Sequence, residues 1–207
     1  MSGRHAELRV KPPGWLAWAV WSAGAAFYLL GFFQRVAPAV MTTELMRDFA
    51  IGATGLGNLS ALYFYSYVAM QVPTGILADA WGPRKLLTAG ALAFGVGAFL
   101  FGAAGSLLLA GTGRVLVGAS AAVAFVALLK LAAHWFKPSH YGLASGLALL
   151  VGVIGALSAG VPLRLAMDHF GWRAVTAATG AATLVLAGVI WVLVRDDPRD
   201  RGFLSHA

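Results

Sequence analysis

The sequence has no cysteine and few charged residues, and each shortage excludes a class of protein. Without cysteine, disulfides and thiolate metal sites are excluded. Charged residues make up 11% of the 207 residues and hydrophobic residues 59%, whereas a typical soluble domain is about 25% charged. A water-facing surface cannot be built from this composition, so we expect most of the backbone to lie in lipid.

Acidic residues are also scarce, with 8 Asp and Glu against 15 Lys and Arg. A nucleic-acid-binding protein gathers its basic residues on one face, whereas here they fall between apolar runs, so no nucleic-acid partner is expected. The five histidines and eight acids show no ligand spacing within an apolar run. We therefore predict no metal site and no cofactor.

Six apolar runs have the length that a membrane-spanning helix requires, about 20 residues for about 30 Å. The predicted spans are about 15–40, 53–78, 84–105, 107–131, 141–163 and 173–194. They form one bundle at 15–194, after a cytoplasmic tail at 1–14 and before a segment at 195–207, which begins a central cytoplasmic loop or forms a C-terminal tail. The expected fold class is an all-α integral membrane protein.

The positions of Lys and Arg predict the orientation of this bundle. With the N-terminus in the cytoplasm, ten basic residues lie inside or at the inner boundary. Only Arg47 and Arg173 fall in outer loops, with Arg164 at the outer end of the fifth span, where it is expected to snorkel. This positive-inside bias predicts cytoplasmic termini in a plasma (inner) membrane.

A short pattern occurs twice. Asp79, Gly82 and Arg84 follow the second span, and Asp168, Gly171 and Arg173 follow the fifth, each 89 residues later. The first turn is expected at the cytoplasmic face and the second outside. Two three-helix units that carry one pattern at opposite faces form an inverted repeat, the plan of many secondary transporters; coincidence is the alternative.

Three features of the sequence resemble the major facilitator superfamily. The pattern Gly75-x-x-x-Asp79-x-x-Gly82-x-Arg84-Lys85 matches the best-known loop motif of that family. Arg114-x-x-x-Gly118 resembles its second motif, with Val117 where many members carry a polar residue. The segments DHFGWRAV, from residue 168, and VRDDPRDRGF, from residue 194, resemble the end of the family's N-terminal half.

The resemblance implies a twelve-helix protein of which this chain is the first six-helix half. It implies secondary active transport of a small solute by alternating access, with a C-terminal six-helix half or a second copy of the chain as partner. A non-transporting membrane scaffold or regulatory half is the alternative. An intramembrane protease built on Ser145 lacks a histidine base on a neighbouring span, so no enzyme and no catalytic residue is predicted.

The first loop motif is interpreted as a conformational latch. Gly75 would allow close helix packing, and Gly82 with the following proline would make the turn. Asp79 would bind the N-terminus of a facing helix. Arg84 and Lys85 would bind the anionic inner leaflet or acids of the partner half.

Polar residues inside the spans are the candidates for binding solute, because buried charges in a membrane usually face a cavity or a partner. The candidates are Tyr28, Gln34, Arg35, Asn58, Tyr63, Tyr67 and Arg114. Since no Asp or Glu lies in any span, an organic anion or zwitterion is the expected solute. Lys130 and His134 are interpreted as a solvated basic edge.

Overall fold

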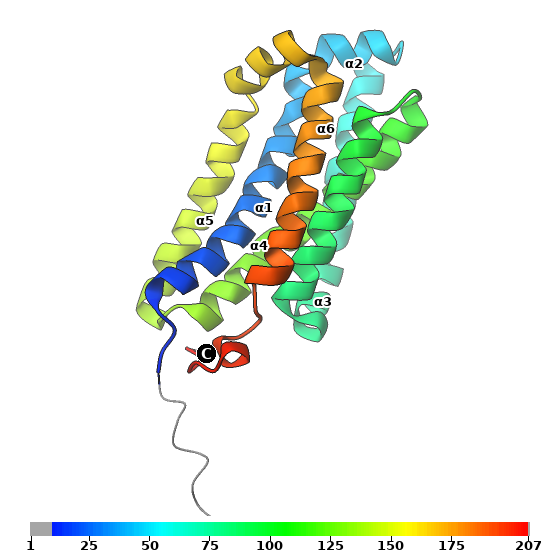
Figure 1. Ribbon diagram of the computed structural model, residues 1–207. Helices are drawn as coiled ribbons and strands as arrows, with labels where there is room; N and C mark the ends of the chain where they lie inside the picture. The colour runs from blue at the N-terminus through cyan, green and yellow to red at the C-terminus, as the bar shows by residue number, and fades with distance from the viewer. Residues whose placement is uncertain (1–9, 207) are drawn as a thin grey trace, which may run out of the picture.

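The computed structural model describes residues 10–206, and all of its regular structure within that range is helical. The helices are α1 (Gly14–Val40), α2 (Thr42–Asp48), α3 (Ala53–Gly102), α4 (Leu107–Trp135), α5 (Pro138–Ser158), α6 (Val161–Leu193) and the 3-10 helix η1 (Pro198–Arg201). They form one elongated bundle, with α2 at one end and the C-terminal segment at the other (Figure 1). Arg4 and Arg9 of the expected N-terminal tail lie outside the described residues.

Five of these helices, α1, α3, α4, α5 and α6, are long and apolar enough to cross a membrane. The 50 residues of α3 would extend about 75 Å as a straight helix, more than twice a bilayer core. Instead α3 is broken at Gly82, where φ is 78° and ψ is 161°, and the chain turns back (Figure 1). The two arms of α3 correspond to the second and third predicted spans.

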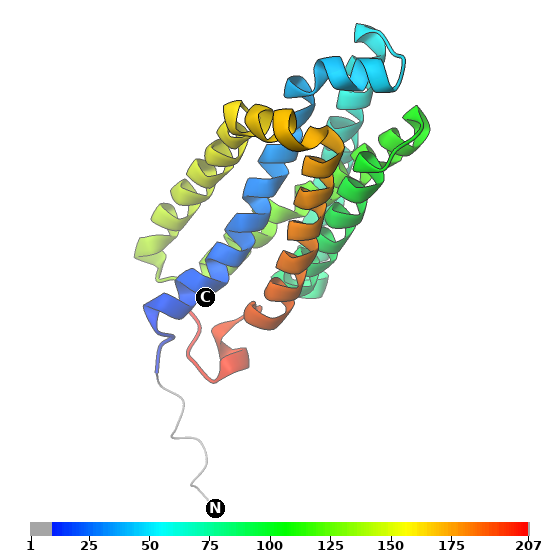
Figure 2. The same ribbon diagram turned by 45° about the horizontal axis from the view of Figure 1, so that its top comes forward.

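The connections differ from the prediction in two places. The predicted span 141–163 ends early, because α5 stops at Ser158 and residues 161–170 form a separate arm of α6. That arm lies across the end of the bundle beside α2 (Figure 2). The second expected loop is likewise a one-residue break at Gly171, with φ 78° and ψ 153°.

The breaks at Gly82 and Gly171 have nearly the same backbone angles and lie at opposite ends of the bundle (Figure 1). A backbone with positive φ and extended ψ is almost confined to glycine. A proline follows Gly82 and a tryptophan follows Gly171, so the glycine and not its neighbour sets the shared conformation.

Contacts across the bundle come in reciprocal pairs under the 89-residue shift. Gly118 on α4 lies against the side chain of Ser66 on α3. Gly155, 89 residues after Ser66, lies against the backbone of Leu29, which is 89 residues before Gly118. The same 89-residue shift therefore relates these two contacts.

The packing of α3 against α6 follows the same rule. A Cβ atom added at Gly95 would lie 2.6 Å from Cδ2 of Leu184, and these two residues are 89 positions apart. The second arms of α3 and α6 thus pack with residues 89 positions apart against each other.

Candidate functional site

Arg35, near the end of α1, lies among four aromatic rings. Its guanidinium carbon is 4.5 Å from the ring centre of Phe32, 4.8 Å from Tyr67, 5.7 Å from Tyr63 and 5.8 Å from Phe64. We call these four rings the Arg35 cage. Aromatic faces attract a cation without neutralising its charge, and Arg35 is half-buried. Among the described residues its Nε finds no hydrogen-bond acceptor.

Arg114 on α4 lies deeper, behind Tyr63. Its side chain is only 1% exposed, and its guanidinium carbon is 5.0 Å from the Tyr63 ring and 5.7 Å from that of Phe101. Nη1 donates a hydrogen bond of 2.8 Å to the backbone carbonyl of Gln34. Within residues 10–206, Nε and Nη2 are buried and have no acceptor.

The Gln34 carbonyl is available because of the α1 sequence. In a helix this oxygen would accept the N–H four residues later, but residue 38 is proline, which has no N–H and whose ring pushes this carbonyl aside. Arg114 supplies the missing donor from another helix. The arginine thus fixes the turn of α1 that carries Arg35.

Two further hydrogen bonds hold the same turn. The Gln34 side chain donates from Nε2 to Oγ1 of Thr179 on α6, at 2.7 Å. The Tyr63 hydroxyl donates to the Gly31 carbonyl at 3.2 Å. Thr179 was not predicted from the sequence, although Thr176, Thr179 and Thr183 recur at helical spacing and would have indicated a polar stripe.

The structure brings together Gln34, Arg35, Tyr63, Tyr67 and Arg114. It places Tyr28 against one ring of the Arg35 cage, that of Phe32, and separates Asn58 from the cluster. Tyr28 is 6% exposed and packs against Phe125 and Phe32. Asn58 is exposed and lines a separate cavity of about 340 Å³ on α3 with Leu62.

The positive charges of Arg35 and Arg114 are not balanced by nearby carboxylates. In the described part of the chain, every ion pair involves a carboxylate of Glu44, Asp48, Asp79, Asp168 or Asp197. Neither Arg35 nor Arg114 belongs to any of these pairs. Two cations with no carboxylate partner, one half-buried and one fully buried, favour the approach of an anion.

Part of the first loop motif contacts other helices of this chain, although Asp79 and Lys85 are themselves exposed. Asp79 accepts a hydrogen bond of 2.6 Å from Nζ of Lys130, which also donates to the Ala78 carbonyl. Lys130 thus lies at a partly solvated edge, as interpreted, and is paired there with an exposed carboxylate. Among the described residues, Gly75 has no neighbour within 4 Å of an added Cβ, so the close packing expected of it is not made by this part of the chain.

Arg84 fastens the break at Gly82 to the end of α6. Its backbone N–H donates to Asp196 at 2.6 Å, and its guanidinium donates to the Trp191 carbonyl at 3.0 and 2.8 Å. The same guanidinium lies 4.0 Å from the Trp191 ring centre. A cation on the last carbonyls of a helix satisfies them and favours the helix dipole.

Arg173 makes the counterpart of this contact at the other end of the bundle. Its Nη1 donates to the carbonyls of Gly102 and Ala104, at 3.0 and 2.7 Å, at the end of α3. Trp191 lies 89 residues after Gly102, as Arg173 lies 89 residues after Arg84. Each arginine therefore caps the end of the helical arm that the other one begins.

The end of the bundle that carries α2 is held by ion pairs. Arg164 binds Glu44 at 2.7 Å and Asp168 at 2.6 Å, so it is paired and does not only snorkel. Asp48 accepts a hydrogen bond of 2.9 Å from the Trp172 indole. This bond, followed by that from Arg47, holds the pKa of Asp48 below its usual value.

Comparison with known proteins agrees with these features. Residues 12–207 match the Major Facilitator Superfamily. An uncharacterized transporter of Bacillus subtilis, YybO, is 33% identical over 188 residues, which cover 88% of this chain and 42% of that protein. A probable sulfoacetate transporter of Cupriavidus necator, SauU, is 26% identical over 83% of this chain and 40% of its own length.

One solved structure shares the fold. It is a bacterial homologue of the human lysosomal transporter Spinster, in an inward-facing and unoccupied conformation, with a TM-score of 0.81 and 18% identity over 91% of this chain and 45% of that one. The chain spans about two fifths of the length of the relatives it matches. The family consists of transporters and not enzymes, so the protease alternative is set aside. This chain is an integral membrane protein that belongs to the Major Facilitator Superfamily and corresponds to its N-terminal half.

Proposed function

We propose that the chain forms one half of a secondary transporter for a small organic anion or zwitterion. The observation that carries this proposal is Arg35, a half-buried cation in an aromatic cage with no carboxylate partner among the described residues. The relative named for sulfoacetate, an organic anion, points the same way. Within this site, Arg35 contacts the solute, while the buried Arg114 adds positive potential and positions α1.

The proposed architecture is two inverted three-helix repeats, α1 with the two arms of α3, and α4 with α5 and α6. The nearly equal backbone angles of Gly82 and Gly171, and the reciprocal caps of Arg84 and Arg173, support it. A second six-helix half, or a second copy of this chain, completes the cavity. The two halves rock about a midplane site to give alternating access.

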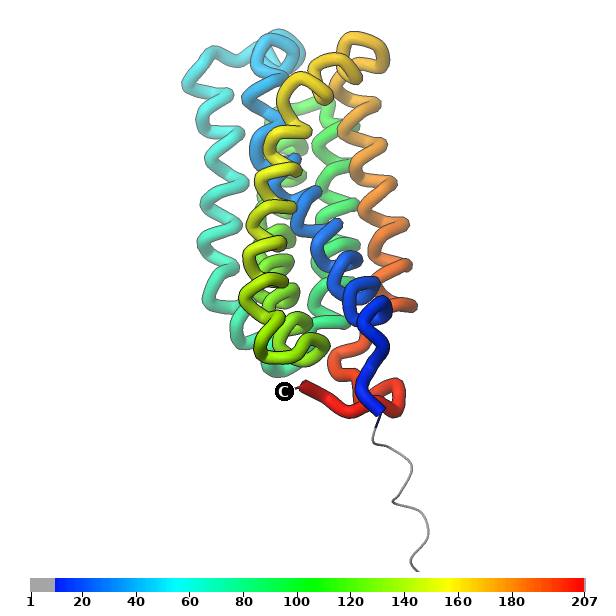
Figure 3. The backbone as a smooth tube through the Cα atoms, turned by 90° about the vertical axis from the view of Figure 1, so that its left-hand side faces the viewer, coloured from blue at the N-terminus to red at the C-terminus, as the bar shows by residue number. Residues whose placement is uncertain are grey.

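The proposed orientation places both described ends of the chain in the cytoplasm. The start of α1 and the C-terminal segment lie at one end of the bundle (Figure 3). At the opposite end Arg47, Arg164 and Arg173 are each within 4 Å of a carboxylate. Their charge is thus largely neutralised, which leaves the excess positive charge on the end with the termini, as the positive-inside rule requires.

Uptake into liposomes tests the proposal. The 207-residue chain is reconstituted alone or with a co-expressed second half, and the solutes are sulfoacetate and a neutral analogue of similar size. Replacing Arg35 by glutamine should weaken anion binding by about 10- to 150-fold, because hydrogen bonds to charged groups are worth about 1.5–3 kcal/mol. Uptake of the neutral analogue should change much less.

Two control variants accompany this experiment. Arg47→Gln removes the same charge from an exposed position and should leave uptake unchanged. Arg114→Gln should reduce both solutes together if this residue acts by positioning α1, and the anion alone if it contacts the solute. Absence of uptake in every combination would favour the scaffold alternative, and equal loss of both solutes in Arg35→Gln would refute charge recognition.

The proposed mechanism includes the first loop motif as a conformational latch. The Asp79–Lys130 pair is exposed on the Asp79 side, so it adds little stability, and its value lies in one conformation of the transport cycle. Asp79→Asn should therefore slow uptake while membrane insertion and thermal stability stay unchanged. Unaltered uptake would remove the latch from the mechanism.

A further inference from the structure

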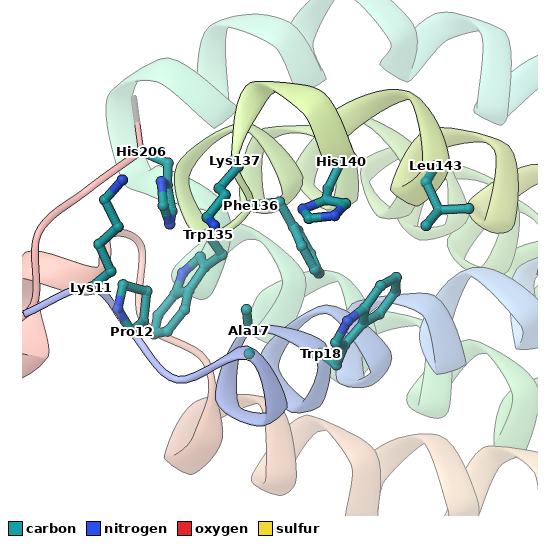
Figure 4. A pocket seen from close by; sticks show the side chains of 11 residues that line it. Lys11, Pro12, Ala17, Trp18, Trp135, Phe136, Lys137, His140, Leu143 and His206 are labelled. Atoms are coloured by element: carbon teal, nitrogen blue, oxygen red, sulfur yellow. The ribbon is translucent and has the colours of Figure 1, made fainter.

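A basic pocket lies at the end of the bundle that carries the C-terminal segment, away from the Arg35 cage. It has a volume of about 480 Å³ and lies between the start of α1, the turn from α4 to α5, and the C-terminal segment (Figure 4). We call it the inner pocket. Its residues are Lys11, Pro12, Gly14, Ala17, Trp18, Trp135, Phe136, Lys137, His140, Leu143 and His206.

The charge of the inner pocket is of one sign. Its lining includes two lysines and two histidines, and no carboxylate belongs to that lining. Figure 4 shows Lys11, Lys137 and His206 gathered on one side of the pocket. Burial, and then the neighbouring charges of Lys11 and Lys137, lower the pKa of His206. The lining itself therefore carries positive charge and no negative charge.

Two helices also begin at this pocket. Gly14 is the first residue of α1, and Lys137 is the N-cap of α5. Neither helix start has a side-chain cap hydrogen bond or an acidic residue in its first turn. Their free N–H groups and dipoles add to the attraction for an anion that the lysines already supply.

Apart from His140, the rest of the pocket is apolar. A small soluble anion would not use this apolar surface. Trp18, Phe136 and Leu143 line the side away from the lysines. Leu143 is 53% exposed and the nearby Trp15 71% exposed, as expected of side chains at a membrane interface. A ligand that fits both sides has an anionic head and a hydrocarbon tail.

We infer that the inner pocket binds the headgroup phosphate of an anionic phospholipid from the surrounding leaflet. Lys11 and Lys137 hold the phosphate, and the first part of an acyl chain packs along Trp18 and Leu143. Basic pockets between spanning helices on the cytoplasmic side are known to bind such headgroups. The inference rests on the proposed orientation, which places this pocket at the cytoplasmic face, and does not depend on the proposed solute.

Binding would also tie together segments distant in the sequence. The backbone of Leu204 donates to the Val10 carbonyl at 3.0 Å, and that of His206 to the His134 carbonyl at 3.2 Å. These bonds already draw the C-terminal segment against the start of the chain and the end of α4. A phosphate between Lys11 and Lys137 screens their repulsion and stabilises this arrangement, so lipid composition controls how firmly the C-terminal segment is held.

Native mass spectrometry of the purified chain tests the inference, with phosphatidylglycerol or phosphatidylcholine added in a neutral detergent. Lys11→Gln and Lys137→Gln should each weaken phosphatidylglycerol binding about fivefold, which corresponds to about 1 kcal/mol per lysine. Lys11→Arg and Lys137→Arg should retain it. Arg199→Gln is the matched control, because Arg199 is an exposed cation near the same end but outside the lining.

The inference holds if phosphatidylglycerol binds more tightly than phosphatidylcholine, if only the pocket variants lose this preference, and if millimolar inorganic phosphate or glycerol phosphate does not compete. It fails if Arg199→Gln causes the same loss, since the effect is then general surface charge. Equal binding of both lipids also refutes it. Competition by inorganic phosphate would make the pocket a site for a soluble anion and would equally refute the lipid assignment. Circular dichroism of each variant confirms its folding.

Discussion

The contact between Arg114 and the Gln34 carbonyl supports a prediction about Pro38 that a double-mutant cycle can measure. If Arg114 satisfies an oxygen that Pro38 leaves without a donor, then Pro38→Ala should make Arg114 less important. Alanine at position 38 restores an N–H four residues after Gln34 and removes the ring that displaces the carbonyl. The two substitutions should therefore be coupled.

The magnitude follows from the hydrogen bond. Arg114→Met leaves the buried carbonyl without a donor, which costs about 1–3 kcal/mol, but it also removes a buried cation that has no carboxylate partner, which stabilises the protein. The single variant mixes these effects. In the Pro38→Ala background only the second remains, so Arg114→Met should be about 1–3 kcal/mol less costly there.

Equilibrium unfolding in mixed micelles, followed by tryptophan fluorescence, gives the four free energies of unfolding. Pro73→Ala serves as the control proline, because it too lies inside a helix while Arg114 donates to the Gln34 carbonyl and not near Pro73. Pro73→Ala and Arg114→Met should be additive within about 0.5 kcal/mol. Additivity of Pro38→Ala with Arg114→Met would show that the hydrogen bond is incidental.

Two further predictions concern the breaks and the α2 end. Gly171→Ala should destabilise the protein by about 1–3 kcal/mol because of its positive φ. Gly82→Ala should destabilise it more, because the added Cβ would also lie 2.7 Å from the Asp196 carboxylate. Equal thermal midpoints of the two variants would contradict this order. Hydrogen bonds from the Trp172 indole and from Arg47 lower the pKa of Asp48 in the folded protein. The ionised carboxylate therefore stabilises the folded protein above the unfolded pKa of about 3.9. This stabilisation is lost as the pH falls through the folded pKa. Asp48→Asn should flatten the acid side of a plot of thermal midpoint against pH, and an unchanged acid side would exclude Asp48 as its cause.

The helices were largely predictable from hydropathy, because each apolar run had to satisfy its own backbone in lipid. The early end of α5 was not predictable from hydropathy, because residues 159–163 are as apolar as the helix before them. Pro162 is the local signal of a new helix. It falls in the first turn of α6, where its missing N–H is tolerated.

The site was predictable as a set of residues but not as an arrangement. An arginine within an apolar run is costly enough to be noticed in the sequence, and Arg35 and Arg114 were both found in this way. Their different burial was not predictable, because it depends on Tyr63 lying between them, and Tyr63 comes from another helix. The partner of Lys130 lies 51 residues away and is set by packing alone.

The repeated pattern is short for a physical reason. A glycine at each break permits the reversal, and an arginine two residues later reaches the end of another helical arm, Trp191 from Arg84 and Gly102 from Arg173. Unsatisfied carbonyls at a helix end in a membrane are costly, so both arginines satisfy carbonyl groups that no apolar side chain can satisfy. At most other packed positions an apolar side chain of suitable volume is enough, and many sequences supply one. The Gly-x-Arg spacing is therefore visible in the sequence, whereas the reciprocal contacts of Gly118 with Ser66 and of Gly155 with Leu29 are visible only in the structure.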